Sequence, residues 1–275
     1  MRKTPTLFTL CSLLYASPTY ASFGQNPVEP KGLAMAGAMT AVHGDAFGMF
    51  YNPASTALAE GTMAGISYTL PYGDNDLVRI TGGFCLPLMS FDRHGTLSGG
   101  VSRFGTNGYD EQTAAFGYAR HVTSSLRAGI SVSRMSIRMR GVGDESATGV
   151  NAGVQAELKP GLTIGISSMN LNSPAMGASG TPLHATTLTG VSYRLATGTL
   201  LTVNAMTSQD RSGRFLAAGE FPVSGNIELM IGMATNPSVV SAGTGIRTGA
   251  FRATLAVSRN MELGTTSSCG VDMTL

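Results

Sequence analysis

The chain has 275 residues, of which 43% are hydrophobic and 12% are charged, and its formal net charge is +2. Its Lys and Arg residues are scattered, whereas nucleic-acid binding needs a concentrated basic face, so a nucleic-acid partner is excluded. The sequence contains no run of about 20 apolar residues that could form a membrane-spanning helix. Spanning helices and closed barrels are the two structures that satisfy every backbone group in lipid. A positive mean hydropathy without such a helix therefore favours a barrel, with a soluble periplasmic β-sandwich as the alternative.

The chain begins like a secretory signal peptide. Arg2 and Lys3 precede an apolar stretch at residues 7–14, and Ala21 offers a small residue for cleavage. Because the stretch is too short to span a bilayer, we expect residues 1–21 to be removed rather than to anchor the chain. We expect the exported chain in the outer membrane of a bacterial cell.

Residues 22–61 differ in composition from the rest of the chain. Small residues and methionines dominate residues 31–55, which favours short helices that contact a surrounding wall closely. We predict that this segment plugs the lumen of a barrel. Its candidate ligand-binding side chains are the larger apolar ones, Met35, Met39, Phe47, Met49 and Phe50.

From Thr62 onward, turn residues divide the chain into about fourteen extended segments, which matches tilted membrane strands of about ten residues joined by short turns. In residues 150–158, Val, Ala and Leu alternate with Asn, Gly, Gln and Glu, and this period excludes a helix. Residues 227–233 and 251–258 repeat the pattern. We predict that residues 62–275 form an all-β, antiparallel up-and-down transmembrane barrel. Four charged residues on its lumenal face should make ion pairs that hold the plug: Glu157, Glu228, Arg252 and Asp272.

One segment breaks the alternation. The face that carries Ile130 and Val132 continues with Arg134, Ser136 and Arg138. Either a β-bulge inverts the pattern, or the strand leaves the membrane, which is the simpler account. Two connections, at residues 105–112 and 172–183, are expected to be longer outward loops.

The carboxyl end has the pattern of a closing strand. Apolar residues occupy every second position from Cys269 to Leu275, although an edge strand of a soluble sheet would alternate in the same way. Cys85 and Cys269 remain after removal of the signal. They could form a disulfide in an oxidising compartment. We interpret both instead as small apolar residues that fill space in the wall.

Several motifs resemble FadL-like and PorV-like outer-membrane proteins. They are the run of small residues and methionines at 32–41, the Gly-Asp-Ala sequence at 44–46, the turn at 51–54 with its Asn52-Pro53-Ala54 marker, and the strand residues 182–195 and 243–247. The similarity covers nearly the whole mature chain and implies a fourteen-stranded barrel with an N-terminal plug. The chain departs from the pattern in ending with Leu275 rather than an aromatic residue and in having no Trp, so its aromatic girdles should be weak.

The resemblance implies two functions of different classes. Similarity to FadL implies passive transport of hydrophobic, fatty-acid-like molecules across the outer membrane, with the ligand lodged against the plug. Similarity to PorV implies a structural or shuttle role in a protein-export or envelope assembly, with partner proteins on the surface loops. A water-filled porin is a third possibility that the plug disfavours.

Catalysis and metal binding lack a supporting motif. His43, His94, His121 and His184 are isolated, without zinc-ligand spacing, and no Gly-x-Ser-x-Gly or phosphate loop occurs. His43 and Asp45 are neighbours, but a polar turn is the simpler interpretation. We predict no enzyme, no metal site and no cofactor. The expected partners are outer-membrane lipid, a hydrophobic small molecule and, for the second function, an envelope or secretion protein.

Overall fold

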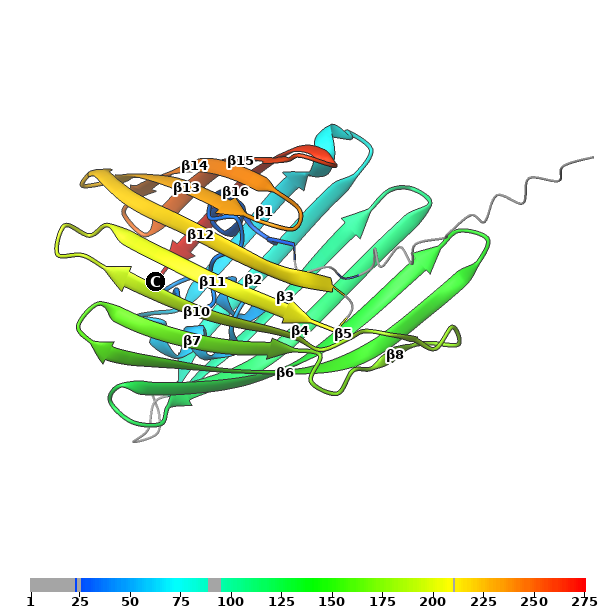
Figure 1. Cartoon of the computed structure of the whole chain (residues 1–275), viewed down its shortest axis with the longest axis horizontal. Coiled ribbons are helices and arrows are strands. Elements are labelled where there is room, and N and C mark those ends of the chain that lie inside the picture. Colours follow the sequence, from blue (N-terminus) through cyan, green and yellow to red (C-terminus); the bar gives the residue numbers. More distant parts are fainter. Residues whose placement is uncertain (1–22, 24–25, 89–94, 210) are drawn as a thin grey trace, which may run out of the picture.

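The computed structural model describes residue 23 and residues 26–88, 95–209 and 211–275. Within these residues, fourteen antiparallel strands form a closed barrel in which neighbours in the chain are neighbours in the wall (Figure 1). The predicted up-and-down barrel is confirmed. The predicted signal peptide, residues 1–21, lies outside the described residues.

The wall closes where the first strand pairs with the last, from Met63 opposite Thr274 to Leu70 opposite Ser267. Its strands are β1 (Met63–Leu70), β2 (Val78–Leu88), β3 (Gly95–Gly105), β4 (Tyr109–His121), β5 (Leu126–Met139), β6 (Gly143–Lys159), β7 (Leu162–Met169), β10 (Thr186–Arg194), β11 (Leu200–Ser208), β12 (Arg211–Ser224), β13 (Ile227–Ala234), β14 (Val239–Thr248), β15 (Phe251–Asn260) and β16 (Gly264–Thr274). A small hairpin, β8 (Ala175–Met176) and β9 (Thr181–Pro182), lies in the connection from β7 to β10.

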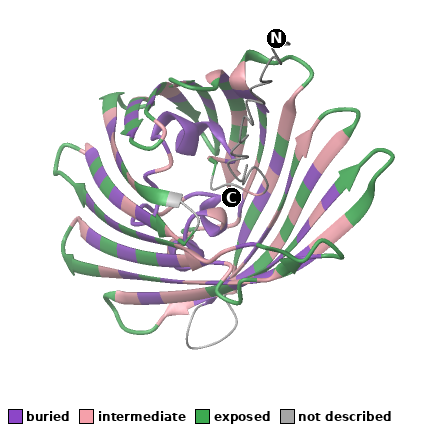
Figure 2. Cartoon of the chain, turned by 45° about the vertical axis from the view of Figure 1, so that its right-hand side comes forward, coloured by how far each residue is buried: buried purple, intermediate pink, exposed green. Residues whose placement is uncertain are grey.

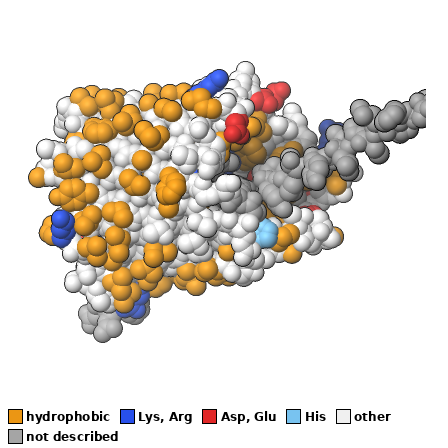
Figure 3. Space-filling view, viewed as in Figure 1, with side chains coloured by type: hydrophobic (Ala, Val, Ile, Leu, Met, Phe, Trp, Pro, Cys, Tyr) orange, Lys and Arg blue, Asp and Glu red, His pale blue; other side chains and the backbone are white. Residues whose placement is uncertain are grey.

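Side chains of each strand point alternately out of the wall and into the lumen, as Figure 2 shows by its stripes of exposed and buried residues. On β15, Phe251 and Leu255 are 55% and 59% exposed, whereas Arg252 and Thr254 between them are 5% and 3% exposed. Hydrophobic side chains spread over the outer wall with few charged ones among them (Figure 3). The alternation therefore gives the barrel an apolar outside and a polar inside, as lipid requires.

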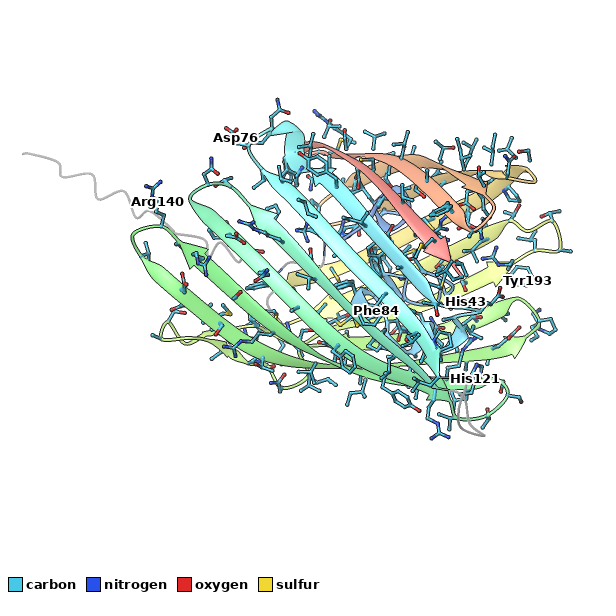
Figure 4. All side chains as sticks on the ribbon, turned by 180° about the vertical axis from the view of Figure 1, so that it is seen from behind. His43, Asp76, Phe84, His121, Arg140 and Tyr193 are labelled. Atoms are coloured by element: carbon cyan, nitrogen blue, oxygen red, sulfur yellow. The ribbon has the colours of Figure 1, made fainter. Side chains whose placement is uncertain are left out.

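The two ends of the barrel differ. The end that holds Leu275, called here the terminus end, has tight turns such as those at residues 160–161 and 225–226. The opposite end, called the loop end, includes the long connection at 170–185, and Asp76 and Arg140 mark it in Figure 4.

Residues 26–61, called here the N-terminal segment, lie inside the barrel for most of their length (Figure 1, blue), with Asn26 and Glu60 exposed. Helix α1 (Pro30–Ala34) contacts β13 to β16, and the 3₁₀ helix η2 (Pro53–Leu58) contacts β3 to β6. Both begin with proline after a capping side chain, Glu29 and Asn52 respectively, which is how short helices are started. A further 3₁₀ helix, η1 (Gly48–Phe50), lies between them, and η3 (Pro71–Gly73) follows β1.

None of the helices in the described part of the chain is long and apolar enough to cross a membrane.

Three local expectations are settled by the strands. β5 pairs with β4 and β6 without a register shift, so no bulge occurs and Arg134 and Arg138 simply continue the outer face beyond the apolar band. The expected long connection at residues 105–112 is wrong, because β3 and β4 extend so far that only residues 106–108 join them. Cys85 and Cys269 do not pair: Cys85 is buried on the lumenal side and Cys269 is exposed.

Candidate ligand-binding lumen

A cavity of about 460 Å³ opens between the N-terminal segment and the loop end of the wall. A narrower cavity of about 100 Å³ continues from it between residues Met49 and Phe50 of the segment and strands β2 to β7. The two cavities share four lining residues: Asn26, Arg79, Phe104 and Glu111. Together they form an inlet from the loop end that stops on the segment.

The inlet combines apolar surface with polar and charged side chains, among them Asn26 and Glu111. Leu33, Met206 and Val239 contribute aliphatic surface. The guanidinium of Arg79 lies over the ring of Phe104, 4.8 Å from its centre. Volumes of this size with a few placed polar groups are typical of small-molecule sites. The inlet can therefore accept a compact apolar molecule and orient a polar atom on it.

The structure separates the five predicted ligand-binding residues into two groups. Met49 and Phe50 line the narrower cavity. Met35, Met39 and Phe47 are packed in the closed core between segment and wall and line neither cavity. The loop-end cavity instead uses wall residues that the sequence did not single out, such as Phe104, Met206 and Val239. The signal that could have indicated them is the alternation along each strand, which places all three on the inward face.

Inward-facing wall side chains hold the segment by its backbone. The hydroxyls of Ser241, Thr202 and Ser192 donate to the carbonyl oxygens of Ala34 (2.8 Å), Ala38 (3.2 Å) and Ala41 (2.8 Å). Gln155 donates to the carbonyls of Thr40 and Val42, and Ser67 to that of Val28. Because most of the segment is not helical, its buried carbonyls need outside donors, which the polar lumenal face supplies.

The Asn52-Pro53-Ala54 turn lies at the centre of this contact. The Asn52 side chain is fully buried and donates to the carbonyl of Thr40 at 2.8 Å, while its Oδ1 accepts from the amide of Ala54 at 3.0 Å. The turn approaches the wall where β5 has Gly129, since a Cβ there would meet the Pro53 carbonyl carbon at 2.5 Å. Glycine permits this approach because it has no side chain.

Ion pairs join the segment to the last strands of the wall. Arg252 on β15 lies 3.2 Å from Asp45 of the segment, 3.0 Å from Asp272 on β16 and 3.5 Å from Glu228 on β13. A second pair joins Lys31 of α1 to Glu220 on β12 at 2.7 Å. Three of the four predicted lumenal charges are thus brought together, because Glu228 and Asp272 both pair with Arg252, which also holds Asp45 of the segment.

The fourth predicted lumenal charge lies elsewhere. Glu157 is exposed near the terminus end of β6, where it accepts a hydrogen bond from the amide of Gly161 at 3.2 Å. A register shift between β6 and β7 begins at this residue, where the lumen ends.

A buried carboxyl group connects the start of α1 to the rest of the segment. Oε1 of Glu29 accepts hydrogen bonds from the amide of Gly32 at 2.5 Å and from the hydroxyl of Tyr51 at 3.1 Å. Burial, and next the nearby charge of Asp45, raise the pKa of Glu29 to about 8. In the seated segment Glu29 is therefore protonated at neutral pH.

This raised pKa predicts that the segment seats more firmly at low pH. A carboxyl group whose pKa is higher in the seated state contributes full stability below its ordinary value of 4.5, and that contribution is lost as the pH rises to about 8. We expect protease access to the segment to increase between pH 5 and pH 8.5. Glu29→Gln, which mimics the protonated form, should remove this dependence, whereas Glu60→Gln, at an exposed position just after η2, should retain it. A wild-type segment with equal access at both pH values would contradict this.

His43 lies in the segment toward the terminus end of the barrel (Figure 4). Burial, and next the charges of Arg127 and Arg194, lower the pKa of His43 to about 4, so the ring is neutral at physiological pH. Within the described residues, no group of three His, Cys, Asp or Glu side chains could hold a metal ion.

Comparison with known proteins gives matches of structure. No family model matches the sequence, and no curated protein matches it. The toluene transporter TbuX of Ralstonia pickettii superposes with a TM-score of 0.65 at 12% identity, over 91% of this chain and 98% of that one. The CymD monoaromatic hydrocarbon channel gives 0.66 at 14% identity, over 92% and 99%.

A FadL homologue of Pseudomonas aeruginosa superposes with a TM-score of 0.62 at 13% identity, over 89% of this chain and 96% of that one. These matches span nearly the whole length of each protein. They agree with the resemblance noted in the Asn52-Pro53-Ala54 turn. The chain has the fold of the FadL-like outer-membrane transporters.

Proposed function

We propose that this protein lies in the bacterial outer membrane and lets hydrophobic small molecules cross it passively. The observation that carries the proposal is the inlet of about 460 Å³, which opens at the loop end and stops on the N-terminal segment. A hydrophobic molecule is stabilised when it leaves water for the aliphatic surface that Leu33, Met206 and Val239 give this chamber, and a plain water-filled pore does not need such a surface. The names of the TbuX and CymD structures, a toluene transporter and a monoaromatic hydrocarbon channel, support the same substrate class.

In this proposal residues 22–61, which include the N-terminal segment, are a plug. A ligand enters from the loop end, settles among Leu33, Met206 and Val239, and advances past Phe104 toward Met49 and Phe50. Its passage needs a shift of the segment or of the wall beside it. No nucleotide or cofactor takes part, because the concentration gradient drives the movement. The ligand is a compact hydrocarbon or a fatty-acid-like molecule.

Filling the inlet should abolish binding. We expect Val239→Trp to place an indole in the cavity and to weaken binding of a fluorescent fatty-acid analogue at least tenfold. In the wild type, toluene and oleate should displace this analogue. Val240→Trp is the matched control, because Val240 is the next residue of β14, is 55% exposed and points out of the wall. Equal binding by the two variants would place the ligand outside this cavity.

The same preparation tests the assembly role. If the wild-type protein binds no hydrophobic probe but is extracted by mild detergent with a stoichiometric protein partner, the transport proposal fails and the PorV-like role is favoured. If it is extracted alone and binds the probe competitively, transport is supported.

A further inference from the structure

Four arginines lie at the loop end of the outer wall, immediately beyond its apolar band. Val132 and Phe116 are outward-facing partners on β5 and β4, and Arg134 follows Val132 on the same face of β5. The full set is Arg103 on β3, Arg134 and Arg138 on β5, and Arg140 in the turn after β5, all of them exposed. We call these four residues the arginine girdle.

Acidic neighbours neutralise only half of this girdle. Arg103 pairs with Asp110 at 2.5 Å and Arg138 with Asp144 at 3.2 Å. Arg134 contacts hydroxyl groups instead, donating to Ser146 at 2.5 Å and to Thr148 at 3.1 Å. Among the residues that the structure describes, neither Arg134 nor Arg140 has an ion-pair partner.

The girdle is held in position by the strand pairing. Arg134 lies opposite Thr148 in the register of β5 and β6, and Arg138 lies opposite both Asp110 and Asp144. Arg134 and Arg138 are four residues apart on one face of β5, which corresponds to about 13 Å along the strand. Arg140 points away from the wall at the loop end in Figure 4. Arg134, Arg138 and Arg140 thus follow one another along β5 and its turn toward the loop end, and Arg103 lies two strands away on β3.

We infer that the arginine girdle binds the phosphate groups of an anionic glycolipid in the surrounding leaflet. Guanidinium groups bind phosphate through paired, charge-assisted hydrogen bonds, and the hydroxyls of Ser146 and Thr148 offer further polar contacts. The acyl chains of the same lipid would cover Val132 and Phe116 just below. A headgroup with two phosphates suits the spacing of Arg134 and Arg138. This inference goes beyond transport, because the girdle is on the outer face and the inlet is in the lumen.

The test counts bound lipid on the full-length protein. Purified protein in detergent is mixed with bis-phosphorylated lipid A, with its monophosphorylated form, or with phosphatidylcholine, and native mass spectrometry measures the bound fraction. We expect retention in the order bis-phosphorylated, monophosphorylated, phosphatidylcholine. The double substitution Arg134→Gln with Arg138→Gln should reduce binding of bis-phosphorylated lipid A by about tenfold or more, since it removes two charge-assisted contacts.

Arg259→Gln is the matched control. Arg259 is also exposed at the loop end and also donates to a threonine, Thr265, at 3.0 Å, but its neighbours in the strand register are Val240 and Thr265, with no second arginine beside it. Its replacement should leave lipid A binding unchanged. Equal lipid A binding by the wild type and the double variant would overturn the inference, as would displacement of the lipid by millimolar inorganic phosphate, which would identify a site for a free anion. Far-ultraviolet circular dichroism confirms that each variant keeps its barrel.

Discussion

Replacement of Arg252 by Met should release the N-terminal segment and turn a nearly closed barrel into a conducting one. Arg252 is the shared partner of Asp45, Asp272 and Glu228, and its side chain is 6% exposed. Without it, three carboxylates face one another in the lumen with no nearby cation between them. Removing one partner of a buried ion pair costs about 3–5 kcal/mol. In planar bilayers we expect Arg252→Met to show frequent large openings that the wild type lacks.

The control for this result lies on the same strand. Arg259→Met removes an exposed arginine that donates a hydrogen bond to the hydroxyl of Thr265 on the wall. Because this contact does not involve the segment, the variant should conduct like the wild type. Adding Asp45→Asn to Arg252→Met removes the segment's own charge from the cluster and should restore part of the closure. If Arg252→Met conducts no more than Arg259→Met, these ion pairs do not hold the segment.

Replacement of Gly232 by Val should have a similarly large effect through packing alone. A Cβ on Gly232 would lie 2.6 Å from the carbonyl carbon of Met35 and 2.7 Å from the amide nitrogen of Ala36. These are backbone atoms, which cannot turn aside as a flexible side chain would. Overpacking of this kind costs about 1–3 kcal/mol, while valine itself suits a strand. We expect an intact barrel whose segment becomes accessible to protease and whose conductance rises several-fold.

Gly82→Val separates this effect from a general loss of glycine. Gly82 is on β2, and the nearest atom to a Cβ there is the carbonyl oxygen of Gly65 at 3.9 Å, so the new side chain meets no part of the segment. Its protease pattern and conductance should match those of the wild type. Release of the segment by both substitutions would show that glycine matters to the wall in general and that contact at Gly232 is not the cause.

The barrel was predictable from the sequence because its determining signal is local. A period of two in residues 227–233 or 251–258 needs only neighbouring residues to be recognised, and a strand that faces lipid on one side imposes it. The continuation of β5 as Arg134 and Arg138 was likewise readable as emergence from the membrane. The joining turn at residues 106–108 was not, because pairing between β3 and β4 converts polar residues that resemble a loop into strand.

The lumen was only partly predictable because its contacts join distant residues. Charges on an inward face were identifiable in Glu228, Arg252 and Asp272, but the pairing of Arg252 with Asp45 depends on where the segment lies. Met35 and Met49 have the same chemistry, yet one is enclosed in the core and the other lines a cavity. Nothing in the composition of the segment distinguishes the side that meets the wall from the side that meets a ligand.

The seam between β1 and β16 has a consequence for the protein before it reaches its membrane. The backbone of Thr62 exchanges hydrogen bonds with that of Leu275, at 3.1 and 2.8 Å, so the wall is complete only when its first strand has met its sixteenth. Until then, β1 and each newly added strand present unpaired amide and carbonyl groups, and exposed strand edges are templates for aggregation. An incomplete chain can therefore never hide its edges by itself. The unfolded protein must be kept apart from other copies throughout its transit.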